Sequence, residues 1–166
     1  MKKLDQFDQK IINELQRDGG LTQRDLADRV GLSANACWNR VRQLRESGII
    51  IGNRIRIDRE KIGLGLVVFV LLRTRHHARA WFEQLRQHVA GIPEIMDFYR
   101  IGGDYDYLLK VVTRDMSSYD RVYQRLISGM EFDSVTSYFA MEAIEESRPL
   151  TVGAALAPGP TGRLAK

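Results

Sequence analysis

The first fifty residues place apolar side chains at helical spacing in three successive segments. One covers residues 5–17, and two shorter ones lie within residues 21–50. Apolar positions that recur every three or four residues are typical of helices that bury one face. The inward positions are Phe7, Ile11, Ile12, Leu15, Leu26, Val30, Cys37, Val41 and Leu44. The pattern predicts three helices that share one small core, in which Cys37 is a small buried residue rather than a redox sensor.

Two of these helices begin eleven residues apart, at Thr22 and at Ser33. Thr22 can cap the first, with Asp25 three positions later as the reciprocal carboxylate, and Ser33 can cap the second. Gly31 is the residue best able to end the intervening helix in a left-handed conformation. This spacing predicts a helix-turn-helix, a motif that reads DNA.

Charge separates the N-terminal part of the chain from the rest. Residues 1–61 carry 13 Lys and Arg against 9 Asp and Glu, whereas residues 62–166 carry 12 of each. The net charge of +4 therefore belongs to the part with the predicted helix-turn-helix. Excess positive charge there favours binding to phosphate.

The exposed side of the helix that begins after Ser33 collects amide and guanidinium groups, which hydrogen-bond base edges and phosphates. Groove contacts are expected from Asn35, Asn39, Arg42 and Gln43. Phosphate contacts or structural ion pairs are expected from Arg40, Arg45, Arg54 and Arg56. The predicted DNA-binding set is Gln23, Ser33, Asn35, Ala36, Trp38, Asn39, Arg40, Arg42, Gln43, Arg45 and Arg54.

From residue 64 the pattern changes to four strand-like segments and two amphipathic helices. Strands are expected at residues 64–74, 95–101, 107–113 and 135–144. A helix separates the first two strands and another separates the last two, so the order is βαββαβ, the ferredoxin-like arrangement. The fold class is therefore α+β, with a three-helix helix-turn-helix domain, plain or winged, before a ferredoxin-like domain for sensing and dimerisation.

The first of these strands is apolar on both of its faces. Val68 and Val70 on one side are matched by Val67, Phe69 and Leu71 on the other. Helices cover only one face of such a sheet, and no further helix is available for the second. A second copy of the sheet is the expected cover, which makes the protein a homodimer.

The expected domain boundaries follow these patterns. The helix-turn-helix domain covers residues 1–50, a connecting strand or linker covers residues 51–61, and the sensing domain covers residues 62–148. Residues 149–166 are rich in Gly, Pro and small residues, which is typical of a flexible tail.

Composition narrows the function classes. The longest apolar run, residues 64–72, is too short to span a bilayer, so no membrane partner is expected. A single cysteine suits a reducing compartment, which predicts a cytoplasmic protein. His76 and His77 are adjacent and point apart, so they make a poor metal site. No catalytic residue, metal or cofactor is expected.

Several longer motifs resemble the Lrp/AsnC family of bacterial and archaeal transcription regulators. They are LADRVGLSANACWNRVRQLRESGII within residues 26–50, IGLGL at residues 62–66, GGDYDYLLKV at residues 102–111 and VTSYFAMEAI at residues 135–144. Ala36-Cys37-Trp38, His76-His77 and Trp81 are similar to the DecR-type cysteine-detoxification regulators within it. The resemblance implies double-stranded DNA as partner, a small amino-acid effector, and homodimers that assemble into octamers.

The resemblance also implies an effector site around the loop between the second and third strands of the sensing domain. The matching residues are Gly102, Gly103, Asp104, Tyr105, Asp106, Thr136, Tyr138 and Phe139. Glycine N–H groups can bind an α-carboxylate, and a carboxylate such as Asp106 can accept bonds from an α-ammonium. By local sequence alone, the composition of this loop favours a simple hairpin turn, for which Gly and Asp are ordinary residues.

The sequence thus favours a transcription regulator controlled by an amino acid, with cysteine as one candidate. Two alternatives stay open. One is a sirohaem decarboxylase-like enzyme, which shares the family's architecture. The other is a DNA-packaging protein with little sequence preference, which would bind its own promoter and random DNA equally.

Overall fold

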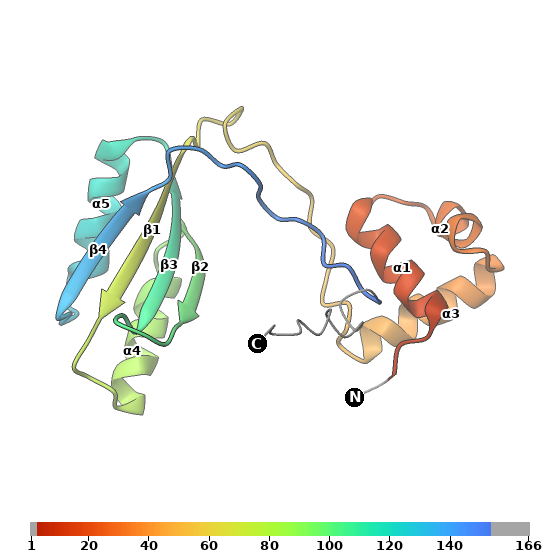
Figure 1. The fold of residues 1–166 in the computed structure, drawn as a ribbon, viewed down its shortest axis with the longest axis horizontal. Helices are drawn as coiled ribbons and strands as arrows, with labels where there is room; N and C mark the ends of the chain where they lie inside the picture. The colour runs from red at the N-terminus through yellow and green to blue at the C-terminus, as the bar shows by residue number, and fades with distance from the viewer. Residues whose placement is uncertain (1–2, 154–166) are drawn as a thin grey trace, which may run out of the picture. The chain divides into compact units, whose positions relative to one another are not determined.

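The computed structural model describes residues 3–153, which form five helices and one four-stranded sheet (Figure 1). The helices are α1 Gln6–Arg17, α2 Gln23–Val30, α3 Ala34–Glu46, α4 Arg79–Ala90 and α5 Met116–Ile127. The strands are β1 Leu66–Arg73, β2 Ile95–Arg100, β3 Tyr107–Thr113 and β4 Ser134–Phe139. The described chain divides into two compact units, of which one holds residues 57–144 and the other holds residues 3–56 together with residues 145–153.

Each of the three N-terminal helices begins after a side-chain cap, and Thr22 and Ser33 are the caps that the sequence predicts. The side chain of Asp5 accepts from two backbone N–H groups of the first turn of α1, each at 2.9 Å. The Thr22 hydroxyl accepts from the N–H of Asp25 at 3.2 Å, and the Ser33 hydroxyl caps α3 in the same way at 3.3 Å. Gly31 ends α2 with φ of 75°, the left-handed conformation that glycine adopts without strain.

These helices share one core, as their spacing predicts. Its buried members are Ile11, Ile12, Leu26, Ala27, Val30, Cys37, Val41 and Leu44. Cys37 has no exposed surface, and burial raises the pKa of its thiol. Its burial confirms the expectation that Cys37 is a small core residue. A thiol that is kept neutral and away from water is also a poor nucleophile.

The sheet has the strand order β2-β3-β1-β4, with each neighbouring pair antiparallel. This is the ferredoxin-like βαββαβ arrangement that the sequence predicts. The last strand is shorter than expected, since it ends at Phe139 rather than at residue 144. The reason is the register of the antiparallel pair. Phe139 pairs with Val68, and β1 begins at Leu66, so β1 offers almost no further partners to residues beyond Phe139.

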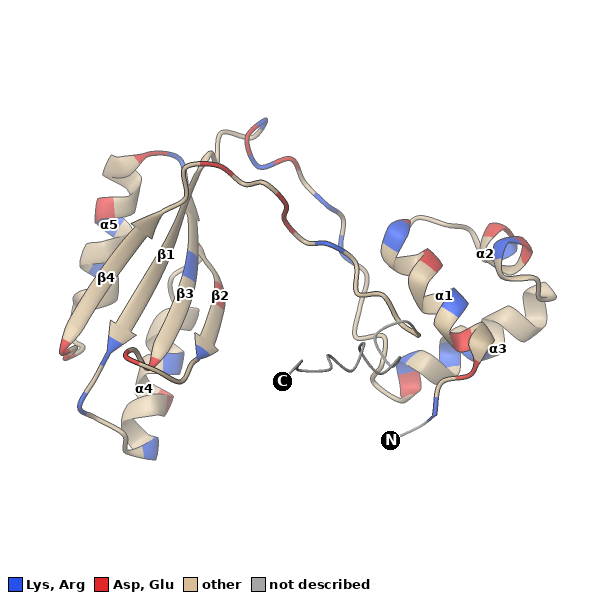
Figure 2. Cartoon of the chain, in the orientation of Figure 1, with Lys and Arg blue, Asp and Glu red and all other residues tan. Residues whose placement is uncertain are grey.

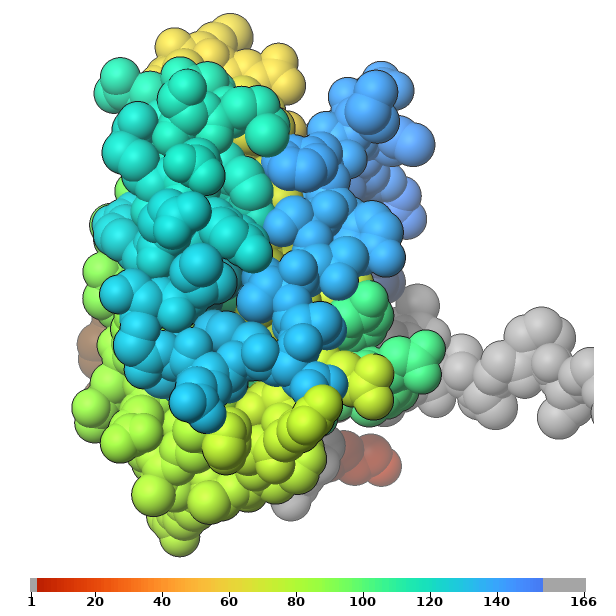
Figure 3. Space-filling view, turned by 90° about the vertical axis from the view of Figure 1, so that its left-hand side faces the viewer, coloured from red at the N-terminus to blue at the C-terminus, as the bar shows by residue number. Residues whose placement is uncertain are grey.

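The two faces of the sheet are covered differently. Val68, Val70 and Leu72 are fully buried against α4 and α5, and Figure 3 shows α5 beside the edge strand β4. On the opposite face, the cross-strand neighbours Phe69 and Tyr138 stay 37% and 54% exposed. In the part of the chain that the structure describes, both rings therefore keep exposed apolar surface, in agreement with the doubly apolar pattern.

The segments outside the helices and strands also differ from expectation in places. Residues 51–61, expected as a connecting strand or linker, contain no strand. Of the expected tail, residues 149–153 lie against α1, and residues 154–166 lie outside the described residues. No helix within residues 3–153 is long and apolar enough to cross a membrane.

Candidate DNA interface and ligand pocket

The buried side of α3 determines which side chains the helix exposes. Cys37, Val41 and Leu44 face the core, so the opposite side carries Asn35 and Arg42, which are both exposed. Figure 2 marks basic residues in blue on α3 and on the segment that follows it. This combination of amides and cations is suited to base edges and phosphates.

Arg42 is held in place on this exposed face by two neighbours. Its guanidinium carbon lies 4.9 Å from the ring centroid of Trp38, one turn earlier, in a cation–π contact. Its Nε lies 3.4 Å from a carboxylate oxygen of Glu46, one turn later. Trp38 is 46% exposed, so its ring supports Arg42 at the surface instead of filling the core.

Arg40 points elsewhere, toward α1. It donates to the carboxylates of Asp5 at 2.7 Å and Asp8 at 2.8 Å, and its guanidinium lies 5.4 Å from the ring centroid of Phe7. These hydrogen bonds raise the pKa of Arg40. Of the two roles expected for this residue, the geometry favours the structural ion pair over a phosphate contact.

A groove of about 190 Å³ lies beside α3 in this unit. Its polar lining residues are Gln23, Trp38, Arg42, Arg45 and Asn53. The amide of Gln23 also donates to the carbonyl of Ala34 at 3.4 Å, which joins the start of α2 to the start of α3. Asn53 was not predicted from sequence, because it belongs to no helix and meets the groove only through the fold.

The remaining residues of the predicted DNA-binding set differ in exposure. Gln43, Arg45 and Arg54 are exposed, whereas Ala36 and Asn39 are half-buried. The Ser33 hydroxyl serves as the cap of α3. Asp8, buried beneath Arg40, is a residue that sequence reasoning missed. A carboxylate beside the apolar positions of a helix was the available signal, since such a group needs a partner when buried.

In the other unit, the loop between β2 and β3 is closed by backbone bonds. The N–H of Ile101 donates to the carbonyl of Asp106 at 2.9 Å, and the N–H of Asp106 donates to the carbonyl of Leu72 at 2.9 Å. The Asp106 carboxylate accepts from the N–H of Thr74 at 2.8 Å. Gly103 has φ of 126°, which side-chain-bearing residues rarely adopt. Asp106 therefore holds the loop against the end of β1.

This loop borders a polar pocket of about 560 Å³. The lining residues are Arg73, Thr74, Arg75, His77, Gly103, Asp104, Asp106 and Asp133. Arg75 and Arg73 lie 2.7 and 3.6 Å from the two carboxylate oxygens of Asp133. Cations and carboxylates that surround one small space can bind a zwitterion such as an amino acid. Sequence reasoning found the loop but missed the arginines and Asp133, which come from other segments.

The structure brings together only some of the predicted effector residues. The hydroxyls of Tyr105 and Thr136 lie 3.2 Å apart. Tyr138 belongs to the open face of the sheet, whereas Phe139 packs edge-on against Tyr119 on the helical face, with centroids 5.4 Å apart. Gly102 is exposed at the start of the loop. The eight residues do not line one cavity within a single chain.

The two adjacent histidines do not share a metal site. His76 stacks on Trp81, with centroids 5.9 Å apart, and its Nε2 lies 3.3 Å from a carboxylate oxygen of Glu131. His77 lines the polar pocket. Among residues 3–153, no cluster of three potential metal ligands is present.

Two family models match successive parts of the chain. Residues 4–51 match a winged helix-turn-helix DNA-binding domain, and residues 67–150 match the Lrp/AsnC ligand binding domain. Curated relatives match over nearly full length. The glutamate uptake regulatory protein of Zymomonas mobilis is 43% identical over 89% of this chain and 90% of its own. The transcriptional activator DecR of Escherichia coli is 41% identical over 90% and 99%.

Solved structures with the same fold include two similar regulators. An AsnC family transcriptional regulator from Agrobacterium tumefaciens has a TM-score of 0.85 and 40% identity, over 89% of this chain and 96% of its own. A transcriptional regulator from Neisseria meningitidis, solved as a complex with L-Met, has a TM-score of 0.85 and 30% identity, over 93% and 100%.

Proposed function

Because the chain belongs to the Lrp/AsnC family of DNA-binding transcription regulators with an amino-acid ligand domain, we propose that α3 is its recognition helix and reads an operator in the major groove. The observation that carries this assignment is the pair Arg42 and Trp38, which holds a guanidinium ready on the exposed face of α3. An arginine fixed in this way is suited to a bidentate contact with guanine. A transcription regulator of a bacterium or archaeon acts on DNA in the cytoplasm, so this is the proposed location of the protein.

The open face of the sheet supports assembly as a homodimer. Phe69, Tyr99 and Tyr138 expose aromatic surface on three different strands of that face. Aromatic side chains exposed together on one surface are typical of a protein interface. Two copies joined there present two recognition helices, which suits a two-fold operator. Further assembly into octamers stays a prediction.

The effector is proposed to bind in the polar pocket beside the β2–β3 loop. Its lining of arginines, carboxylates and a histidine favours a small amino acid with a polar side chain, with cysteine as the first candidate. The relatives support an amino-acid ligand, since one is named for glutamate uptake and another was solved with L-Met. For the effector to control the regulator, it must bind at least two states of the regulator with different affinities.

The named relatives are transcription regulators, so the decarboxylase alternative finds no support among them. The DNA-packaging alternative differs in specificity alone. A comparison of the protein's own promoter with random DNA at physiological salt separates the two, because only a specific regulator prefers its operator by several orders of magnitude.

Substitution of Arg42 tests the assignment of α3. Arg42→Ala should weaken binding to a fluorescent fragment of the protein's own promoter by about tenfold or more, the value of one bidentate base contact. Arg86→Ala on α4 removes a similarly exposed arginine outside the proposed interface and serves as the control. Equal affinities for the two variants at the same salt concentration would remove Arg42 from the interface.

A thermal-shift screen of the proteinogenic amino acids tests the pocket. A ligand that binds only the folded state raises the melting temperature in proportion to its occupancy. The shift should be largest for polar amino acids and should disappear in Asp104→Ala, whose side chain lines the pocket. A shift of equal size in that variant would place the effector elsewhere.

A further inference from the structure

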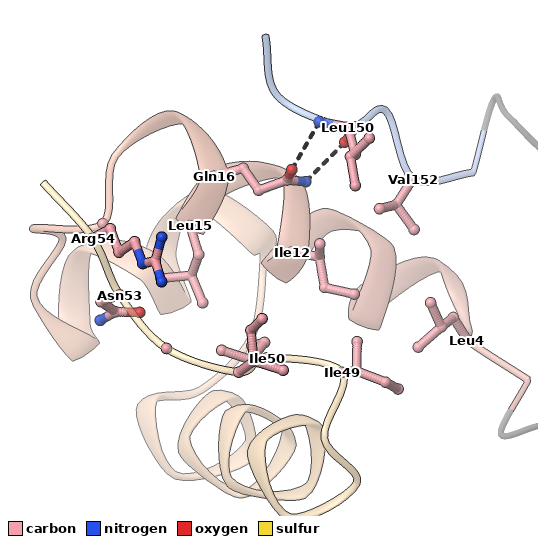
Figure 4. A pocket seen from close by; sticks show the side chains of 13 residues that line it. Leu4, Ile12, Leu15, Gln16, Ile49, Ile50, Asn53, Arg54, Leu150 and Val152 are labelled. Atoms are coloured by element: carbon pink, nitrogen blue, oxygen red, sulfur yellow. Dashed lines mark hydrogen bonds between the residues drawn. The ribbon is translucent and has the colours of Figure 1, made fainter. Parts of the chain in front are cut away.

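The segment that follows β4 leaves the sensing unit and joins the helix-turn-helix unit. There it lies along α1, close to residues 49–54 (Figure 4). The chain therefore passes between the two units twice, once after residue 56 and once after residue 144. Because the returning segment ends in a contact with α1, it closes a loop in the chain. Closing a loop restricts the conformations of the chain, which a loose tail would not do.

Two side-chain amides of α1 hold this segment by its backbone. Gln16 donates to the carbonyl of Leu150 and accepts from its N–H, both at 2.8 Å. Asn13 makes the same pair of bonds with Val152, both at 3.1 Å. Each amide thus exchanges two bonds with one residue, as one antiparallel strand does with another. Asn13 and Gln16 lie one turn apart on α1, and their partners are alternate residues of the segment.

The segment also fits α1 sterically. Val152 packs against the core of the helix-turn-helix unit and lines an apolar groove of about 470 Å³ with residues such as Ile12 and Ile50. Gly153 has φ of 106°, and a Cβ there would lie 2.6 Å from the side-chain oxygen of Gln9. The positive φ favours glycine at this position, and a larger residue would also displace the end of the Gln9 side chain.

A further hydrogen bond joins the two connections to each other. The Nη2 of Arg56, in the outgoing connection, donates to the carbonyl of Glu146 in the returning one at 3.3 Å. We propose that α1 is a docking site for the chain's own residues 149–153, and that the docked segment is a second link that restrains the helix-turn-helix unit. A unit held by two anchored connections has less freedom than a unit on one linker.

Hydrogen exchange in the full-length protein tests the docking. The amide hydrogens of Leu150 and Val152 are bonded to Gln16 and Asn13, so Asn13→Ala combined with Gln16→Ala should speed their exchange by at least about tenfold. Alanine keeps the helix, because it has the highest helix propensity. Unchanged exchange at both amides would overturn the docking site.

The matched control changes two amides at the same spacing elsewhere. Gln84→Ala combined with Gln87→Ala removes two exposed amides three residues apart on α4. This control should leave exchange in residues 149–153 unchanged. Faster exchange in the control as well would show that the segment responds to general destabilisation, which contradicts docking through α1.

Tryptophan anisotropy tests the restraint itself. In a Trp81→Phe background, Trp38 on α3 is the one remaining tryptophan and reports motion of the helix-turn-helix unit. Release of the segment should increase the amplitude of depolarisation on the nanosecond timescale. If the amide variant frees residues 149–153 but Trp38 moves as before, the segment is docked without restraining the unit, and the proposal fails.

Two truncations test the same restraint without any change in α1. Termination after Arg148 removes Leu150 and Val152 and should reproduce the larger motion of Trp38. Termination after Gly153 keeps the docked residues and should behave as the full chain does. Equal motion in the two truncations would overturn the proposal.

Discussion

Arg40 of α3 donates a hydrogen bond of 2.8 Å to the carboxylate of Asp8 in α1, across 32 residues of sequence. The Asp8 side chain is only 4% exposed, whereas that of Arg40 is 30% exposed. The same guanidinium reaches Asp5, which caps α1. The contact ties α3, the proposed recognition helix, to α1 and leaves the opposite side of α3 exposed.

Loss of this contact should destabilise the helix-turn-helix unit. Arg40→Ala removes the guanidinium partner of the buried Asp8 carboxylate, so the free energy of unfolding should fall by about 1–3 kcal/mol. Urea unfolding followed by Trp38 fluorescence, in the Trp81→Phe background, measures the change. Arg24→Ala removes an exposed arginine of α2 and should change stability by less than about 0.5 kcal/mol. Equal stabilities for the two variants would contradict a structural role for Arg40.

Acid should weaken the same unit through Asp5. The backbone N–H of Asp8 and then the Arg40 guanidinium lower the pKa of Asp5 below its ordinary value. A carboxylate whose pKa is lowered by folding stabilises the protein fully above its unfolded pKa and loses that contribution as pH falls through the folded pKa. Unfolding free energies measured from about pH 6 down to about pH 2 should therefore decline for the wild-type unit.

Asp5→Asn isolates this contribution, because asparagine caps helices nearly as well as aspartate and does not titrate. Its stability should decline less steeply over the acid range than that of the wild type. Asp28→Asn, at an exposed position of α2, should follow the wild-type curve. A parallel decline in all three proteins would assign the acid sensitivity to other carboxylates.

Asp104 and Asp106 should behave differently although they are neighbours in one loop. Asp106→Ala leaves the buried N–H of Thr74 without its acceptor, so the sensing unit should lose about 1–2 kcal/mol of stability. Asp104→Ala should keep stability within about 0.5 kcal/mol and weaken amino-acid binding instead. Thermal unfolding followed by Trp81 fluorescence separates the two effects. A larger loss of stability in Asp104→Ala than in Asp106→Ala would contradict these assignments.

Charge placed on the open sheet face should prevent dimerisation. Phe69→Lys puts an ammonium group beside Lys110, its cross-strand neighbour, on the proposed interface of both copies. Burial of the added ammonium group there is costly, so sedimentation should give a species of 19.0 kDa. Met116→Lys, at an exposed apolar position at the start of α5, should leave the assembly unchanged. A dimer that survives Phe69→Lys would show that another surface joins the copies.

The sequence predicted the elements well where the signals are local. Thr22, Ser33 and Gly31 mark the boundaries of α2 and α3 through bonds and backbone conformations that involve only neighbouring residues. The residues expected for β3 are those that the structure assigns to it. The end of β4 was predicted less well, because a strand continues only as long as its partner β1 does.

The candidate sites were predicted only where they, too, depend on local signals. The exposed face of α3 follows from helical spacing once the buried positions are known. The polar pocket does not, because Arg75 and Asp133 are 58 residues apart and meet only through the fold.

By itself, the sequence determined the order of helices and strands, the helix-turn-helix, the excess charge on that part of the chain, and the family. These depend on spacing, caps and composition, which are local properties. The tertiary structure decided that Arg40 pairs with Asp8, that Asp106 secures its loop, and that Leu150 and Val152 return to Gln16 and Asn13. Such contacts join residues 32 to 139 positions apart, so no local pattern contains them. They arise only when packing within each unit brings distant polar groups within hydrogen-bonding distance.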